Sequence, residues 1–157
     1  MLPLVSTQRR EQALRYKHTL GQFCCLKSWL MLFEDVDMTS FRHDEWKYNE
    51  HGKPYIEGGP YFSISHCKEG IAVAIDNQPI GIDIECIRHA DESLIERTMN
   101  EQERVRMDDR KFTRLWTQKE AVVKAQGTGI YSFEQLQNLG VQSTEYRIQT
   151  FEKEKYI

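Results

Sequence analysis

The sequence predicts an α+β fold, and three observations support this prediction. Apolar side chains recur every three or four residues between residues 8 and 33, which is the spacing of an amphipathic helix. Short apolar segments separated by glycine and proline turns follow up to residue 86, which indicates antiparallel strands. A second helical pattern covers residues 112–126 and ends at Gly127 and Gly129.

The elements are expected in a simple order along the chain. The first helix takes up residues 8–33, and Gly21 weakens it slightly. Turns are expected at Gly52–Pro54 and Gly58–Pro60. Three strands are then expected to form an antiparallel meander, at residues 61–65, 70–76 and 80–86. The remaining elements are expected to be helices at residues 92–99, 101–107 and 112–126, and a tail that combines a short helix with strand-like pieces such as residues 145–151.

Length and charge exclude several classes of protein. A chain of 157 residues can form one domain with a core of its own. The 21 basic and 24 acidic residues give a net charge of −3, which argues against a general nucleic-acid binder and against disorder. The longest apolar runs, residues 29–33 and 71–75, are far too short to span a bilayer, and the N-terminus shows no signal peptide. A cytoplasmic protein is therefore expected.

The cysteines predict neither a disulfide framework nor a zinc site. The sequence contains no CxxC pair, and the four cysteines are Cys24, Cys25, Cys67 and Cys86. Free thiols in a reducing cytosol are the expected state.

The segment Ile80–Glu85 is the first candidate site. Side chains alternate along a strand, so Asp83 and Glu85 are expected on one face, about 7 Å apart. Two such carboxylates are half of a site for Mg²⁺, which prefers oxygen ligands and is often shared with substrate phosphates. The alternative is an ordinary edge strand with a solvated acidic face.

The segment Trp116–Lys124 is the second candidate site. On a helix, Trp116, Glu120 and Lys124 share one face because they are four residues apart. The carboxylate can supply a third metal ligand and the lysine a cation for phosphate. The alternative is a helix-stabilising Glu–Lys pair, worth a few tenths of a kcal/mol.

Other catalytic patterns are weak or absent. Ser65 and His66 end a predicted strand, although a lone histidine is more often structural than functional. The sequence has no GxSxG elbow for a nucleophile. It also lacks the glycine-rich phosphate loops GxxxxGK[ST] and GxGxxG.

Four segments together resemble a known family. They are, in order, Gly52–Pro54, Phe62–His66, Ile80–Glu85, and Trp116–Lys124 with Gly127 and Gly129. Their order and spacing are similar to those of the 4′-phosphopantetheinyl transferases of the Sfp-like superfamily, over residues from about 8 to 135. Two residues depart from the family pattern: Ser63 stands where Asn is common, and Cys67 where Ser is common.

The resemblance implies a fold and a reaction. The fold is the 4′-phosphopantetheinyl transferase-like one, in which two small pseudo-symmetric lobes of antiparallel sheet and helices make a single compact unit. The N-terminal lobe would cover about residues 1–79 and the C-terminal lobe about residues 80–157. Family members move phosphopantetheine from coenzyme A (CoA) to a serine of an apo acyl or peptidyl carrier protein, and 3′,5′-ADP is released.

The resemblance also implies roles for individual residues. The Mg²⁺ ligands would be Asp83, Glu85 and Glu120, and Glu120 is also the favoured general base for the serine. Lys124 would neutralise the phosphate and assist the departing ADP oxygen. The CoA contacts would be Lys17, Lys53, Pro54, Ser65, a cationic His66, Asp83 and Lys124, with Lys17 at the 3′-phosphate.

The remaining expectations concern partners and competing functions. Arg110 and Arg114 share a helix face, which predicts a docking surface for an acidic carrier protein; the alternative is a solvated surface of mixed charge. A monomer is expected, with no nucleic-acid or membrane partner. Two functions compete with the transferase: a non-catalytic relic that binds CoA or a carrier protein, and a metal-dependent nucleotide hydrolase.

Overall fold

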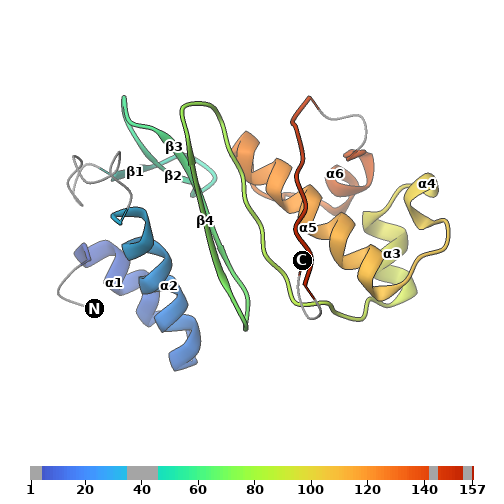
Figure 1. The fold of residues 1–157 in the computed structure, drawn as a ribbon, viewed down its shortest axis with the longest axis horizontal. Helices are drawn as coiled ribbons and strands as arrows, with labels where there is room; N and C mark the ends of the chain where they lie inside the picture. Colours follow the sequence, from blue (N-terminus) through green and yellow to red (C-terminus); the bar gives the residue numbers. More distant parts are fainter. Residues whose placement is uncertain (1–4, 35–45, 142–144, 154–156) are drawn as a thin grey trace.

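The computed structural model describes residues 5–34, 46–141, 145–153 and 157. Two N-terminal helices lie on one side of the strands, and the C-terminal helices lie on the other side (Figure 1). The helices are α1 (Thr7–Leu14), α2 (Thr19–Leu32), α3 (Glu92–Thr98), α4 (Glu101–Arg104), α5 (Asp109–Gln126) and α6 (Phe133–Asn138). The α+β class predicted from the sequence is confirmed.

The single helix expected at residues 8–33 is wrong, because the chain forms two helices there. Ser6 caps the start of α1, Arg15 is its C-cap, and the extended residue His18 precedes α2. The chain turns back between the helices, and this turn brings the Tyr16 ring against Gly21. A Cβ atom at residue 21 would lie 2.9 Å from that ring, so the glycine permits the close approach of the turn to α2.

The strands of the described residues form two separate antiparallel hairpins. Strand β3 (Tyr61–His66) pairs with β4 (Ile71–Asp76), which confirms the two antiparallel strands expected at residues 61–65 and 70–76, and the register places Tyr61 opposite Asp76. Strand β1 (Trp46–Tyr48) pairs with β2 (Pro54–Ile56), a hairpin that the sequence pattern does not predict.

The third strand expected at residues 80–86 is wrong as a sheet strand. The segment forms no backbone ladder with β3, and its Ile82 amide donates instead to the Ser63 hydroxyl at 3.1 Å. Its other neighbour is a helix. A Cβ atom at residue 81 would lie 1.9 Å from the Ala121 carbonyl oxygen of α5, so Gly81 is required for this contact.

The C-terminal helices differ from their predicted bounds at the ends. Helix α4 is shorter than expected, and Arg106 beyond it has a φ of 51°. Helix α5 begins earlier than expected, where the Asp108 side chain accepts a bond from the Lys111 amide. The strand-like tail at residues 145–151 has no regular strand. Within the described residues, no helix combines the length and apolar character needed to cross a membrane.

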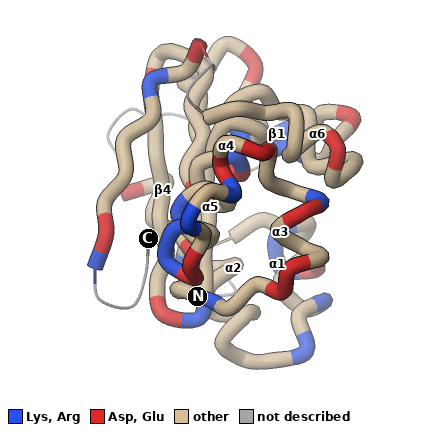
Figure 2. Tube along the Cα trace, turned by 90° about the vertical axis from the view of Figure 1, so that its right-hand side faces the viewer, with Lys and Arg blue, Asp and Glu red and all other residues tan. Residues whose placement is uncertain are grey.

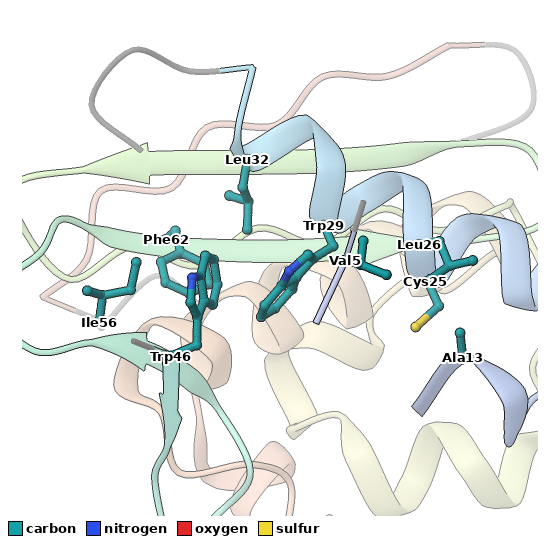
Figure 3. Close-up of a cluster of buried hydrophobic side chains, with 9 residues drawn as sticks. All are labelled: Val5, Ala13, Cys25, Leu26, Trp29, Leu32, Trp46, Ile56 and Phe62. Carbon is teal, nitrogen blue, oxygen red and sulfur yellow. The ribbon is translucent and has the colours of Figure 1, made fainter. Parts of the chain in front are cut away.

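Two groups of buried side chains form the core. The first joins α2 to both hairpins, and the Trp46 ring lies 3.8 Å from Trp29 and 4.6 Å from Phe62, centroid to centroid (Figure 3). The second lies among the C-terminal helices and contains Ala90, Met99, Phe112 and Leu115. The segment at residues 80–86 therefore runs between two packed regions.

Candidate functional site

The site is built where residues 80–86 cross α5. Because Gly81 has no side chain, the segment lies directly on the helix backbone at Ala121 and Ala125. This contact places Asp83 beside Lys124, which lies one turn beyond Glu120 on the same face of α5.

Asp83 is the centre of a hydrogen-bonded group. Its Oδ1 atom accepts the Lys124 ammonium at 2.6 Å and the Ser65 hydroxyl at 2.7 Å. Lys124 also donates to Ser65 at 3.0 Å, which closes a triangle between β3, residues 80–86 and α5. The Asp83 side chain is only 4% exposed, and its Oδ2 atom is buried without a hydrogen-bond partner.

Glu85 and Glu120 share the electrostatic environment of Asp83. Burial raises the pKa of Glu120, and the negative charges of Asp83 and Glu85 raise it further, against the opposing effect of Lys124. Burial and the charge of Asp83 likewise raise the pKa of Glu85. Asp83, Glu85 and Glu120 are therefore close enough to influence one another electrostatically, and their convergence on one metal ion stays a prediction.

The donor set fits a hard divalent cation. Among the described residues, no three or more His, Cys, Asp or Glu side chains are already arranged to hold a metal ion. However, the unpartnered Asp83 Oδ2 is an oxygen ligand of the type that Mg²⁺ prefers. A cation there would also oppose the burial and the mutual repulsion that raise the pKa of Glu85 and Glu120.

Two adjoining cavities open beside Lys124. The first, of about 220 Å³, lies between the β1–β2 turn, β3 and the end of α5; the second has about 270 Å³. They adjoin because they share lining residues, namely Gly52, Pro54, Ile64 and Lys124. Ser65 and His66 line the second cavity, whereas Lys53 lines the first.

The ammonium of Lys53 is held at the C-terminal end of α5. It donates to the carbonyl oxygens of Lys124 at 2.5 Å, Ala125 at 3.3 Å and Ile80 at 3.4 Å. Burial lowers the pKa of Lys53. The positive charge also suits the negative end of the helix dipole, so Lys53 fixes the wall of the first cavity as well as lining it.

His66 differs from the expected cationic side chain. Burial, together with the positive charges of Arg9 and Lys124, lowers the pKa of His66. The neutral imidazole is therefore favoured at pH 7 in the ligand-free protein. Its ring packs edge-on against Tyr16, with 5.8 Å between the centroids.

Arg9 is a cavity residue that the sequence did not reveal. It is 4% exposed and donates to the Cys25 carbonyl from both Nη2, at 2.6 Å, and Nε, at 3.0 Å. Together with Gln12, Tyr16 and Tyr48 it lines the second cavity. Only contact with α2 distinguishes Arg9 from the other arginines of its segment, so no local pattern could have identified it.

Three predicted residues lie apart from this group. Lys17 is exposed in the turn between α1 and α2 and lines neither cavity. Arg110 and Arg114 lie on α5, and both pair with Glu152 of the C-terminal segment. Basic and acidic residues alternate over this side of the molecule and form no block of a single sign (Figure 2). Carrier docking at these arginines stays a prediction.

Known proteins resemble this chain over most of its length. Residues 79–156 match the model of the 4′-phosphopantetheinyl transferase superfamily. The chain is 38% identical over 137 residues to the 4′-phosphopantetheinyl transferase gsp of Aneurinibacillus migulanus. The aligned residues make up 81% of this chain and 58% of that protein. It is 28% identical over 144 residues to 4′-phosphopantetheinyl transferase Sfp of Bacillus subtilis strain 168, covering 82% and 63%. The chain thus spans about three fifths of the length of these relatives.

Proposed function

Because the chain belongs to the 4′-phosphopantetheinyl transferase superfamily, we propose that it transfers 4′-phosphopantetheine from CoA to a carrier protein. The acceptor is a serine of an apo acyl or peptidyl carrier protein, the reaction depends on Mg²⁺, and 3′,5′-ADP is released. The main supporting observation is the Lys124–Asp83 pair, 2.6 Å apart at the edge of two adjoining cavities.

The metal ligands in this proposal are Asp83, Glu85 and Glu120. Asp83 would use its unpartnered Oδ2 atom, since Oδ1 already accepts Lys124 and Ser65. When bound, Mg²⁺ supplies Lewis-acid stabilisation of the pyrophosphate oxygens and a template that orients them.

Glu120 is the proposed general base. As a carboxylate it would accept the proton of the serine hydroxyl; burial raises the pKa of Glu120 in the metal-free protein, and a bound cation would lower it again. The serine oxygen then forms a bond to the phosphorus that carries the pantetheine arm. The bond from that phosphorus to the ADP oxygen breaks, and the leaving oxygen keeps the electron pair.

Positively charged side chains at the two cavities would stabilise this transfer. Lys124 lines both cavities and would neutralise a phosphate placed across them. Ser65 and neutral His66 would contact the CoA phosphates from the second cavity, with His66 as a hydrogen-bond donor, and Arg9 adds a buried positive charge there. Lys53 and Pro54 would contact the adenosine end in the first cavity.

Lys17 remains a proposed contact to the 3′-phosphate. Its exposed position in the turn before α2 leaves the ammonium in solvent in the ligand-free protein. Under this proposal Lys17→Ala weakens CoA binding, and an unchanged affinity would show that the side chain does not reach the ligand.

Mass spectrometry of the carrier protein tests the proposed function. A panel of apo acyl and peptidyl carrier proteins is incubated with the chain, CoA and Mg²⁺, and each intact carrier is weighed. At least one carrier should gain the phosphopantetheine mass on its serine. No gain on any carrier by a folded, CoA-binding chain would contradict the transferase proposal.

A non-catalytic CoA-binding protein is the second candidate. The observation that favours it is the absence of a ready-made metal arrangement among the described residues, while Lys124 occupies Asp83 Oδ1. Calorimetric binding of CoA without transfer to any carrier would support this candidate. CoA breakdown without a carrier would instead indicate a hydrolase.

A further inference from the structure

Two cysteines from distant parts of the sequence meet beside the site. The Sγ atoms of Cys67 and Cys86 lie 3.6 Å apart, and both side chains are half-buried. Cys67 directly follows His66 at the end of β3, and Cys86 directly follows Glu85. Neither thiol takes part in the proposed transfer.

This contact is the last step of a ladder between β3 and residues 82–86. Ser63 accepts the Ile82 amide at 3.1 Å, and Ser65 donates to Asp83 at 2.7 Å. Residues 63, 65 and 67 alternate along the chain, so their side chains lie on the same face toward that segment. The first two steps hold the segments in register and keep the thiols close.

The backbone on both sides of the contact is also fixed. The Cys67 amide donates to the Gly70 carbonyl at 2.9 Å, which closes the β3–β4 turn. Glu85, the neighbour of Cys86, exchanges two backbone hydrogen bonds with Ile157, each 2.9 Å long. The two thiols therefore face each other from anchored segments and need only a small approach to bond.

We propose that Cys67 and Cys86 form a reversible intramolecular disulfide when the protein meets a low-molecular-weight disulfide such as oxidised glutathione. One cysteine thiolate attacks the reagent, its S–S bond breaks, and one glutathione thiol leaves. The second cysteine then attacks the mixed disulfide, and the second glutathione thiol leaves. Two thiols are oxidised, one reagent disulfide is reduced, and the two cysteine protons end on the two glutathione molecules.

The other two cysteines do not compete for the reagent. Cys24 and Cys25 are 4% and 1% exposed in α2, and Cys25 belongs to the first core cluster. The crosslink would join Cys67, next to His66, to Cys86, next to Glu85. It would thereby fix the strand that lines the second cavity to the segment that carries the acidic side chains.

Peptide mapping of the oxidised protein tests this proposal without any activity measurement. Trypsin cleaves after Lys68 and Arg88, so the two cysteines fall on separate peptides. Full-length protein is incubated with excess oxidised glutathione, free thiols are alkylated, and the digest is analysed before and after dithiothreitol. Because burial raises the pKa of the Cys67 thiol, the incubation is long.

The expected product is a monomer lighter by two hydrogens, with a Cys67–Cys86 linked peptide pair that dithiothreitol separates. It should also melt at a higher temperature than the reduced protein, since the crosslink restricts the unfolded chain. Cys24→Ser is the matched control and should give the same linked pair. Cys86→Ser should instead retain a glutathione adduct on Cys67.

Three results would overturn the proposal. They are wild-type protein that stays fully reduced, wild-type protein that keeps glutathione on either cysteine, and links that form only between two chains. These results are read from the wild type, so a Cys86→Ser variant that fails to fold does not affect them.

Discussion

Replacing Gly81 by alanine perturbs the contact on which the whole site depends. A Cβ atom at residue 81 would lie 1.9 Å from the Ala121 carbonyl oxygen and 2.5 Å from the Ala125 amide nitrogen. Both atoms belong to the backbone of α5, which cannot rotate away as a side chain can. Overpacking costs typically 1–3 kcal/mol, and with two backbone atoms affected we expect a loss of about 3 kcal/mol in the free energy of unfolding. Residues 80–86 would also move away from α5, which separates Asp83 from Lys124.

Urea denaturation of the two purified proteins measures this loss. Gly70→Ala is the matched control, because a Cβ atom there meets only the Ile84 side chain, whose Cδ1 atom lies 2.7 Å away. The end of that side chain can rotate, so we expect the control to lose less than about 1 kcal/mol. Equal stability of Gly81→Ala and wild type would refute the claim that residues 80–86 rest directly on α5.

Three further predictions concern buried or paired charges. Lys119 is 1% exposed and its ammonium lies 2.6 Å from Glu103. Lys119→Met leaves that carboxylate without its cation, and urea denaturation should show a loss of about 3–5 kcal/mol in the free energy of unfolding. A loss under about 1 kcal/mol would show that the pair is dispensable. Burial raises the pKa of Glu120 in the folded protein, so without metal the wild type loses stability as the pH rises from the unfolded-state pKa through the folded-state pKa. Glu120→Gln should therefore be more stable than wild type at pH 7, and this difference should vanish as the pH falls below the unfolded-state pKa; a difference independent of pH would exclude the stated cause. Arg110→Glu combined with Arg114→Glu should raise the carrier-protein KM several-fold and leave CoA affinity unchanged, and an unchanged KM would place docking elsewhere.

The fold class and the main hairpin could be predicted because their signals are local. Alternating apolar residues bounded by turns specify β3 and β4, and the two glycines after α5 mark its end. The break between α1 and α2 could not be predicted, because no proline interrupts the periodic pattern there. The β1–β2 hairpin has only three residues in each strand, which is too short for alternation to be recognised.

The site could be predicted in part from spacing and family resemblance. Asp83 meets Lys124 because residues 80–86 and α5 cross at Gly81, and Glu85 and Glu120 lie close enough to share the electrostatic environment of this pair. The alternation of apolar and acidic residues over residues 80–86 predicted a third sheet strand. This pattern does not specify the neighbours of the segment, and on one side the neighbour is the helix α5. The burial of Arg9 and the neutral state preferred by His66 arise from tertiary contacts, which no local pattern encodes.

The conversion of an apo carrier protein by wild type and by Asp83→Asn tests the central claim most directly. Asparagine keeps the size of residue 83 but removes the charge that pairs with Lys124 and the carboxylate oxygen offered to Mg²⁺. The intact carrier is weighed after equal incubation with CoA and Mg²⁺, and CoA binding to each enzyme is measured in parallel. We predict that wild type converts the carrier and that the folded variant binds CoA but loses at least about 100-fold in rate. Equal conversion by the variant, or none by a wild type that binds CoA, would contradict the proposed catalytic site.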